Sequence, residues 1–374
     1  MKYLKFLLLG IIAVSFISCS DSDDDSLEIP EDKDNELARP QDISEYNTDK
    51  DGLRDYFATD YFDIGAAIEP NAIDNTNDAK LMKRHFNSLT AENVMKWSSL
   101  QKTEGNFTYT SADKIVNFAH NNDMKVRGHA LCWHQQAPDW IFEDKGQTAS
   151  KEVVLERLRT HISNIVAHFK GKVYAWDVVN EAIDDGGNIY RGSKWYNICG
   201  EDFIIEAFKA AREADPNLKL FYNDYSTTQP IKRDKIYKLL KKLKDKGLVD
   251  GIGMQSHWNI NAPSNGLIID AIQKYASLGI EIQITELDVS VYPSNSDSES
   301  EYTNSIETQQ QIAYARFFST FRTYKDNITS VTFWGATDKD SWLNNWPVSG
   351  RTNYPLLFDS KHNPKQSYFS VIDF

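Results

Sequence analysis

The chain has 374 residues, of which 41% are hydrophobic and 12% aromatic, and its formal net charge is −13. This composition provides for a large core and argues against a nucleic-acid-binding protein, because a phosphate backbone requires a basic surface. The three cysteines, Cys19, Cys132 and Cys199, have neither the spacing of a metal site nor that of a disulfide framework. We therefore expect no metal ion and no cofactor.

Residues 1–19 have the features of an export signal. Lys2 and Lys5 precede the apolar run FLLLGIIAVSFI, which is too short to remain in a bilayer as a spanning helix. The run ends at Ser18-Cys19, which resembles a bacterial lipobox, and the following SDSDDDS resembles the acidic export signal of surface lipoproteins. These resemblances imply a lipid on Cys19 as the one membrane attachment, and an outer-membrane lipoprotein exposed at the cell surface. The alternative is an ordinary cleaved signal peptide followed by a polar linker.

Residues 20–50 are predicted to form a disordered acidic tether. Positions 21–50 hold twelve Asp or Glu and three Lys or Arg, a net charge of −9. Pro30, Pro40 and a low apolar content oppose regular structure in this stretch. Outside positions 1–50 the charge is only −6, which would not repel a neutral polysaccharide.

From residue 57 onward, short apolar stretches alternate with amphipathic segments that have helical spacing. The apolar stretches predict strands at 61–67, 87–95, 125–133, 173–181, 218–225, 251–258, 280–289 and 328–338. The amphipathic segments predict helices at 78–86, 111–123, 151–171, 201–216, 233–247, 266–279, 308–327 and 364–372.

This alternation predicts an α/β fold, a (β/α)8 TIM barrel that forms a single catalytic domain over residues 51–374. A doubly wound open sheet is the alternative, but no GxGxxG or P-loop pattern opens any of the predicted helices. In a (β/α)8 barrel the active site lies at the C-terminal ends of the strands. The residues that follow each strand are therefore the candidates for chemistry.

Polar side chains follow almost every predicted strand, which capping of single strands does not explain. The set consists of Glu92, Asn93, Lys96, His129, Trp133, His134, Gln136, Asn180, Glu181, Asn223, Asp224, Gln255, His257, Glu286, Asp288, Trp334 and Trp342. Glu181 follows the fourth strand and Glu286 ends the seventh, and these two strands lie nearly opposite each other in an eight-stranded barrel. Two carboxyl groups that flank one bond are the requirement for glycoside hydrolysis, with one neutral acid and one ionised nucleophile or base. Either Glu taken singly is more often a surface or ion-paired residue.

The neighbours of the two glutamates suit the same chemistry. Asn180 offers a neutral amide to a sugar 2-hydroxyl group, a contact that strengthens in the transition state. Glu286 and Asp288 are two residues apart in ITELDV, so they share one face of a strand. We expect Asp288 to bond His257 and His257 to bond Glu286, an arrangement that would orient a nucleophile and help to keep it ionised.

Seven segments in chain order, FNSLTAENVMKW, RGHALCWHQQ, WDVVNEA, FYNDY, GIGMQSHW, ITELDV and FWGATDKDSW, resemble glycoside hydrolase family 10, the β-1,4-xylanases, from about residue 60 to 374. The resemblance implies a retaining endo-β-1,4-xylanase, with Glu181 as acid/base, Glu286 as nucleophile, and a cis peptide bond between His129 and Ala130. It also implies that xylose units on the glycone side are held by Glu92, Asn93 and Lys96, and that the wall around the cleaved sugar is formed by His129, Trp133 and Gln136. The residues that surround the nucleophile would be Asn180, Gln255 and His257. The aromatic floor and lid over the cleaved sugar would be Trp334 and Trp342.

The substrates that follow from this resemblance are xylan and xylo-oligosaccharides, cleaved by a protein that we expect to be a monomer. Retention requires the two carboxyl groups to be about 5–5.5 Å apart. Bulky indoles at Trp334 and Trp342 would exclude the hydroxymethyl group of glucose. Three alternatives stay open: the same barrel acting on cellulose or mixed-linked glucan, a protein that captures glycans without cutting them, and a metal-dependent hydrolase. The acidic segment 292–305 either shapes the glycone end of the groove or is a surface loop.

Overall fold

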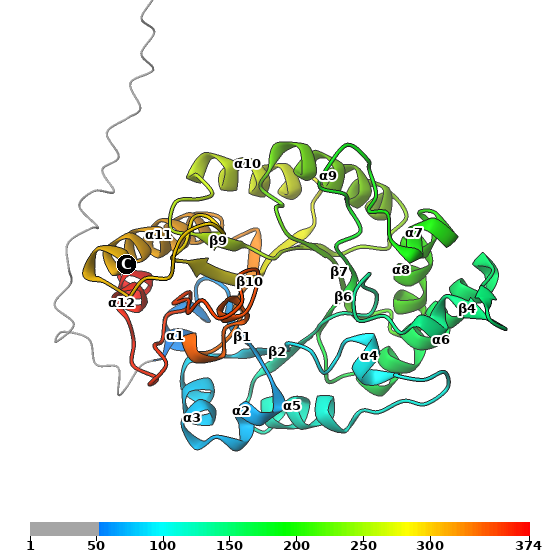
Figure 1. Cartoon of the computed structure of the whole chain (residues 1–374), viewed down its shortest axis with the longest axis horizontal. Helices are drawn as coiled ribbons and strands as arrows, with labels where there is room; N and C mark the ends of the chain where they lie inside the picture. The colour runs from blue at the N-terminus through cyan, green and yellow to red at the C-terminus, as the bar shows by residue number, and fades with distance from the viewer. Residues whose placement is uncertain (1–51) are drawn as a thin grey trace, which may run out of the picture. The chain divides into compact units, whose positions relative to one another are not determined.

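The computed structural model describes residues 52–374, and in this part of the chain parallel strands form a closed barrel surrounded by helices (Figure 1). Strand β11 pairs with β1 on one side and with β10 on the other, so the barrel has no open edge. The predicted (β/α)8 barrel is confirmed and the open sheet is excluded. The barrel strands are β1 (Asp63–Ile68), β2 (Ser88–Ala91), β3 (Lys125–Gly128), β6 (Ala175–Asn180), β7 (Lys219–Asp224), β8 (Gly251–Met254), β10 (Glu281–Ser290) and β11 (Ile328–Phe333).

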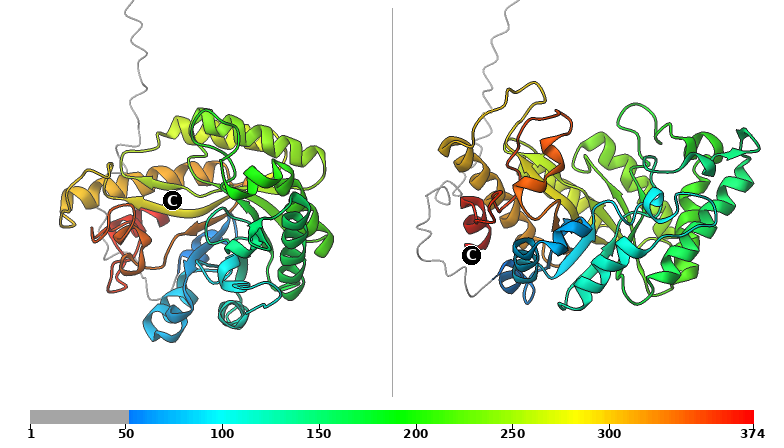
Figure 2. Two further views of the ribbon diagram at one scale, coloured as in Figure 1. Left: turned by 45° about the vertical axis from the view of Figure 1, so that its right-hand side comes forward. Right: turned by 60° about the horizontal axis from the view of Figure 1, so that its bottom comes forward.

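The helices between the strands cover the outside of the barrel (Figure 2). Their buried faces follow from apolar residues at helical spacing, as in α6, where Leu158, Ile162 and Ile165 face the core. The larger helices are α3 (Thr76–His85), α5 (Thr110–His120), α6 (Lys151–His168), α8 (Asp202–Ala214), α9 (Pro230–Asp245), α10 (Asn265–Ala276), α11 (Asn304–Thr323) and α12 (Gln366–Ile372).

Local sequence signals explain where several helices begin and end. The Ser150 side chain accepts from the Val153 amide and caps α6. Helix α9 begins at Pro230, and the chain leaves it at Gly247 with φ +69°, a left-handed conformation that glycine adopts without steric cost.

Four predicted strands end several residues earlier in the structure than the sequence indicates. The prediction of one strand over 251–258 is wrong: β8 ends at Met254 and β9 (His257–Asn259) begins after Ser256. Ser256 has φ +63°, which an extended strand does not accommodate. The strands predicted at 87–95, 125–133 and 328–338 end at Ala91, Gly128 and Phe333. In all four places the chain continues past the barrel strand into a segment that carries polar site residues.

Several short elements were not predicted, because runs this brief show no measurable periodicity. They are α1 (Leu53–Phe57), α2 (Pro70–Asp74), α4 (Trp97–Leu100), α7 (Lys194–Cys199), the 3₁₀ turns Asp139–Ile141, Asp338–Asp340 and Trp342–Asn344, and the hairpin of β4 (Glu143–Asp144) and β5 (Gln147–Thr148). Most of them lie in the connections that follow the strands and so surround the carboxyl end of the barrel.

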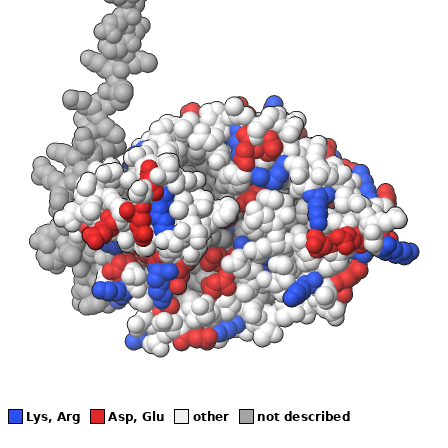
Figure 3. Space-filling model, in the orientation of Figure 1, with Lys and Arg blue, Asp and Glu red and all other residues white. Residues whose placement is uncertain are grey.

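The predicted signal peptide, the lipidation at Cys19 and the acidic tether over 20–50 lie outside the described residues. Within residues 52–374, no helix combines the length and apolarity that crossing a bilayer requires. Acidic and basic side chains are interspersed on the face of this unit that Figure 3 shows.

Candidate active site

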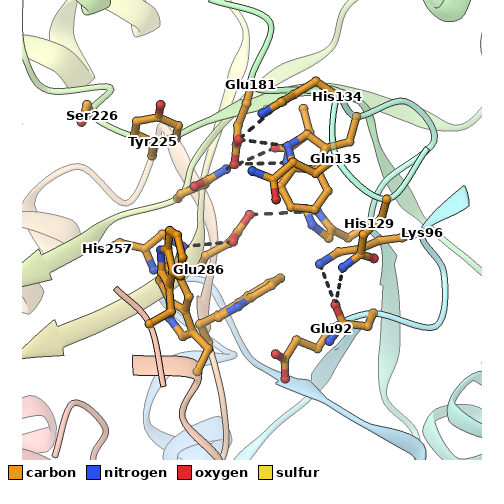
Figure 4. A pocket seen from close by; sticks show the side chains of 18 of the residues that line it. Glu92, Lys96, His129, His134, Gln135, Glu181, Tyr225, Ser226, His257 and Glu286 are labelled. Carbon is orange, nitrogen blue, oxygen red and sulfur yellow. Dashed lines mark hydrogen bonds and ion pairs between the residues drawn. The ribbon is translucent and has the colours of Figure 1, made fainter. Parts of the chain in front are cut away.

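A pocket of about 600 Å³ opens where the barrel strands end (Figure 4). Of the predicted site residues, all line it except Asn223, Asp224 and Asp288, which lie behind its wall. The lining consists of Glu92, Asn93, Lys96, His129, Trp133, His134, Gln135, Gln136, Asn180, Glu181, Arg191, Tyr225, Ser226, Gln255, His257, Glu286, Trp334, Trp342 and Trp346. Residues up to 254 positions apart in the chain, from Glu92 to Trp346, are thus brought around one space.

Glu286 lies on β10 in a dense set of hydrogen bonds. Its Oε1 accepts from Asn223 Nδ2 at 2.7 Å, and its Oε2 lies 3.2 Å from His257 Nε2. His257 Nδ1 is 2.8 Å from Asp288 Oδ2, an oxygen that also accepts from Trp342 Nε1 at 2.8 Å. The predicted chain of contacts from Asp288 through His257 to Glu286 is confirmed, and Asp288 stands behind the histidine rather than in the pocket wall.

The charges around Glu286 decide its protonation. Burial by itself raises the pKa of this carboxyl, but the imidazole of His129 at 4.0 Å and the hydrogen bonds from His257 and Asn223 outweigh it and lower the pKa to about 2. Burial disfavours a charged His257, yet the carboxylate of Asp288 raises the pKa of this histidine to about 10. At neutral pH, Glu286 is therefore an ionised carboxylate held against an imidazolium.

Glu181 has a different environment at the end of β6. Its backbone has φ +57°, and its amide donates to the Asn223 carbonyl at 2.9 Å, which fixes a left-handed turn directly after the strand. Trp133 Nε1 donates to Oε2 and Gln255 Nε2 to Oε1, both at 2.9 Å. His134 Nδ1 lies 3.9 Å from Oε2, and burial lowers the pKa of His134. Figure 4 shows the carboxyl groups of Glu181 and Glu286 directed toward the same part of the pocket.

A buried ionic network lies inside the barrel next to the pocket, and it was not predicted from the sequence. Arg127 of β3 forms an ion pair with Asp177 of β6, and Arg127 Nε donates to Gln283 Oε1 at 2.7 Å. Asp177 also lies 2.9 Å from His129 Nδ1 and so orients that ring. The available signal was a charged residue inside each of two apolar strands, KVRG and AWDVV. The cis peptide bond expected between His129 and Ala130 is present.

Another group of polar side chains forms the end of the pocket near β2. Lys96 Nζ donates to Asn93 Oδ1 at 2.9 Å and lies 4.9 Å from the centre of the Trp133 ring. Asn93 Nδ2 donates to Glu69 Oε1 at 2.7 Å, and Gln136 Nε2 donates to Asn93 Oδ1 at 3.3 Å. Burial, and then the charge of Glu69, raise the pKa of Glu92 to about 7. This end of the pocket offers several hydrogen-bonding groups to a polyhydroxylated ligand.

Besides Trp133, three further tryptophans contribute indole surface to the pocket. Trp334 packs edge-on against His129 with ring centres 5.3 Å apart, and Trp342 lies 4.8 Å from the ring of His257. Trp346 is 63% exposed, although it also lines the pocket. Flat apolar faces beside clustered hydrogen-bonding groups match the two surfaces of a sugar ring.

The prediction missed Gln135, Arg191, Tyr225, Ser226 and Trp346. Arg191 Nε donates to the Glu181 carbonyl at 2.9 Å, and its Nη2 lies 2.6 Å from the Tyr225 hydroxyl. Tyr225 directly follows β7 in FYNDY, so the strand-end criterion could have found it. Arg191 and Trp346 come from long connections whose course no local pattern indicates.

The polar groups of this pocket do not form a metal site. Among residues 52–374, no three His, Cys, Asp or Glu side chains are grouped as ligands of a metal ion. The arrangement instead presents one carboxylate held ionised and a second carboxyl with a different set of donors, across a space lined with amides and indoles. That is the chemistry of acid- and nucleophile-assisted glycoside cleavage.

Comparison with known proteins agrees with this geometry. The model of glycosyl hydrolase family 10 matches residues 52–374. The β-1,4-xylanase of Dictyoglomus thermophilum is 48% identical over 320 residues, which cover 84% of this chain and 89% of that protein. The crystal structure of xylanase XynB from Paenibacillus barcinonensis, complexed with a conduramine derivative, superposes with a TM-score of 0.84 at 46% identity, covering 87% of this chain and 99% of that one.

A solved endo-1,4-β-xylanase from Caldicellulosiruptor owensensis likewise superposes with a TM-score of 0.84 at 43% identity, over 87% of this chain and all of that one. The family match spans the described part of the chain, and the relatives are similar over nearly their whole length. The chain therefore belongs to glycosyl hydrolase family 10.

Proposed function

We propose that the protein is a retaining endo-β-1,4-xylanase that hydrolyses internal bonds of xylan through a covalent glycosyl-enzyme. The observation that carries this proposal is the pair Glu181 and Glu286, which line one pocket in different environments. The relatives reported above carry the name xylanase, which supports xylan as the substrate.

In the first step, the ionised Glu286 attacks the anomeric carbon while the bond from this carbon to the glycosidic oxygen breaks. Glu181 gives its proton to the departing oxygen, so a glycosyl ester on Glu286 and a shortened chain with a free hydroxyl group result. In the second step, Glu181 removes a proton from water, and the resulting hydroxide displaces Glu286 from the anomeric carbon. Two inversions leave the configuration unchanged.

The surrounding side chains suit this reaction. The imidazolium of His257 keeps Glu286 ionised despite its burial, which a nucleophile requires. Asn180 precedes Glu181 and lines the pocket, where its amide can bond the 2-hydroxyl group of the cleaved sugar. Lys96 and Asn93 provide donors and acceptors for the hydroxyl groups of the glycone, and Trp334 and Trp342 supply bulk that would collide with a hydroxymethyl group.

A product time course tests the proposal. The full chain would be incubated with 4-linked xylan and, separately, with a soluble cellulose derivative, next to Glu286→Ala. We expect early release of mixed-length xylo-oligosaccharides, lost in the variant, and NMR of the first products should show the β-anomer. Activity on the cellulose derivative alone would show that the substrate is a glucan rather than xylan. Binding of both polymers without cleavage would indicate a glycan-capturing protein.

Crystallography tests the mechanism independently of the substrate. Retention predicts a separation of about 5–5.5 Å between the carboxyl groups of Glu181 and Glu286, whereas about 6.5–9.5 Å would require an inverting mechanism.

For the N-terminal region, we propose attachment of a lipid to Cys19 and a surface-exposed outer-membrane lipoprotein. The support is the sequence: Lys2 and Lys5, the apolar run and Ser18-Cys19. Metabolic labelling with a fatty acid, compared between the wild type and Cys19→Ala, tests the modification. Protease accessibility on intact cells tests the orientation.

A further inference from the structure

A second cavity of about 390 Å³ lies between helix α3 and the segment 358–364, and it shares no lining residue with the catalytic pocket. Figures 1 and 2 show α3, in blue, beside the red C-terminal part of the chain. The residues that line the cavity are Asn77, Lys80, Leu81, Arg84, His85, Phe358, Lys361, His362 and Pro364. Three of them are permanent cations and none is an acid.

None of the three cations forms an ion pair within residues 52–374, although Lys361 acts electrostatically on the Asp359 carboxylate. Among residues 52–374, the amino groups of Lys80 and Lys361 and the guanidinium of Arg84 make no hydrogen bond or ion pair, and Nε and Nη2 of Arg84 are also shielded from solvent. Most other cations of this unit are paired; Lys339, for example, lies 2.9 Å from Asp78. Three clustered cations, two of them exposed and one half-buried, create a local positive potential that attracts anions.

The two nearest carboxylates are already occupied by other groups. Asp78 pairs with Lys339 and with His362. Asp359 accepts from the backbone amides of Lys361 and Asn363 and from the Asn363 side chain. His85 does not add to the charge, because burial, and then the neighbouring Arg84, lower the pKa of this imidazole to about 3. The positive charge of the cavity therefore comes from Lys80, Arg84 and Lys361, of which Lys361 is partly offset by the Asp359 carboxylate.

Stabilisation of a helix end does not account for this cluster. Arg84 lies in the last turn of α3, where a cation favours the helix dipole. Lys80 is in the middle of that helix, however, and Lys361 comes from a loop near the C-terminus, so no common helix end brings them together. The same cavity has an apolar side, formed by Leu81, Phe358 and Pro364. A ligand that fits both surfaces combines a compact apolar face with an oxyanion.

We propose that this cavity is an anion-binding site for a ligand of monosaccharide size, and that the ligand is the carboxylate of a sugar acid. A cavity of about 390 Å³ is large enough for one pyranose ring. The carboxylate would contact the cations of Lys80, Arg84 and Lys361, and the C–H face of the ring would pack against the half-buried Pro364. The shared chemistry, an oxyanion on a small sugar body, also describes a sugar phosphate. The site does not depend on the proposed catalytic activity.

Isothermal titration calorimetry of the full chain at low ionic strength tests the proposal with sodium glucuronate, neutral glucose and glucose 6-phosphate. We expect glucuronate to bind, glucose not to bind, and added NaCl to weaken the binding. The variant Arg84→Gln/Lys361→Gln should weaken binding of glucuronate by roughly tenfold or more, the loss expected for charged hydrogen bonds. Lys83→Gln is the matched control, because this exposed lysine lies on the same helix outside the cavity, and it should bind like the wild type.

Two further measurements separate loss of the site from loss of the fold. The variant Lys80→Gln/Lys361→Gln changes only exposed side chains. Its thermal unfolding temperature should therefore equal that of the wild type, while its affinity for glucuronate should be lower. Binding at the catalytic pocket would not respond to either double variant. If glucose 6-phosphate alone binds, and the double variants lose it, the oxyanion site stands with phosphate as its ligand. Equal binding of glucose and glucuronate, or undiminished binding by both double variants, would overturn the proposal.

Discussion

The end of β10 and the end of β6 each present one glutamate to the same pocket, yet the two carboxyl groups meet opposite conditions. The Glu286 side chain is 6% exposed and touches a charged imidazolium, a second histidine and an amide. The Glu181 side chain is 12% exposed and receives hydrogen bonds from the neutral N–H groups of Trp133 and Gln255. The residue type is the same, so the difference in environment comes from the neighbours that the fold supplies, and the proposed difference in role follows from it.

One pocket thus gives two carboxyl groups different electrostatic surroundings. Net positive charge around Glu286 overcomes the cost of burying a carboxylate, and it lowers the pKa to about 2. The Glu181 carboxyl instead accepts hydrogen bonds from the neutral N–H groups of Trp133 and Gln255, which hold it in place. Each prediction below removes or alters one side of this contrast.

The largest effect is expected from Glu286→Ala. Loss of the nucleophile should lower kcat on xylan by roughly 10⁴-fold or more, as removal of a covalent catalyst does. Sodium azide should restore turnover of an activated aryl xyloside and yield the α-glycosyl azide, because one displacement replaces two. Glu281→Ala, at the other end of the same strand, is the control and should keep activity. A β-azide from the Glu286 variant would contradict its role.

Glu181→Ala should lower kcat on xylan by about 10²–10⁴-fold, the usual contribution of a general acid. An aryl xyloside whose leaving group needs no proton should still form the covalent intermediate, so a burst of phenolate is expected. Added azide should give the β-glycosyl azide, the opposite anomer to that from Glu286→Ala. Equal loss on both substrates, without a burst, would show that Glu181 does not act as the proton donor.

Replacing His257 with Asn should move the acid limb of the pH profile. The wild-type pKa of Glu286 is lowered to about 2, so its ionised form persists to low pH. Without the imidazolium, burial raises this pKa, and activity should be lost as pH falls at a point about 1–2 units higher. The measurement is kcat/KM against pH, with exposed His120→Asn as the control. A loss of activity that is uniform across pH would contradict the electrostatic role.

The smallest effect concerns Glu92, whose pKa is raised to about 7. Below this pH the carboxyl is neutral, and hydrogen bonds from sugar hydroxyl groups to it are weaker than those to a carboxylate. KM for a xylo-oligosaccharide should therefore rise about threefold or more as pH falls from 8 to 6, with kcat less affected. Glu92→Gln should abolish this dependence of KM on pH. A parallel dependence in the variant would assign the titration to another group.

Local patterns in the chain were enough to predict the barrel and most of its active site. Alternating apolar strands and amphipathic helices from residue 57 onward indicate a (β/α)8 barrel, because each unit must bury one face against its neighbours. Polar residues at the strand ends, among them Asn180, Glu181 and Glu286, indicate where the pocket lies. The contact between His257 and Asp288 was also predictable, since the two residues lie at the ends of adjacent strands.

Tertiary packing decided the features that join distant segments. The left-handed turn at Ser256 divides an apolar run that the sequence predicts as one continuous strand. The ion pair of Arg127 with Asp177 joins the neighbouring strands β3 and β6 inside the barrel, and the second cavity brings Lys80 beside Lys361. The hydrophobic periodicity of a helix or strand arises because one face of that segment is buried, so it can be recognised from residues that are close in sequence. Which charges meet, and whether they are matched, depends on contacts that exist only once the barrel has closed.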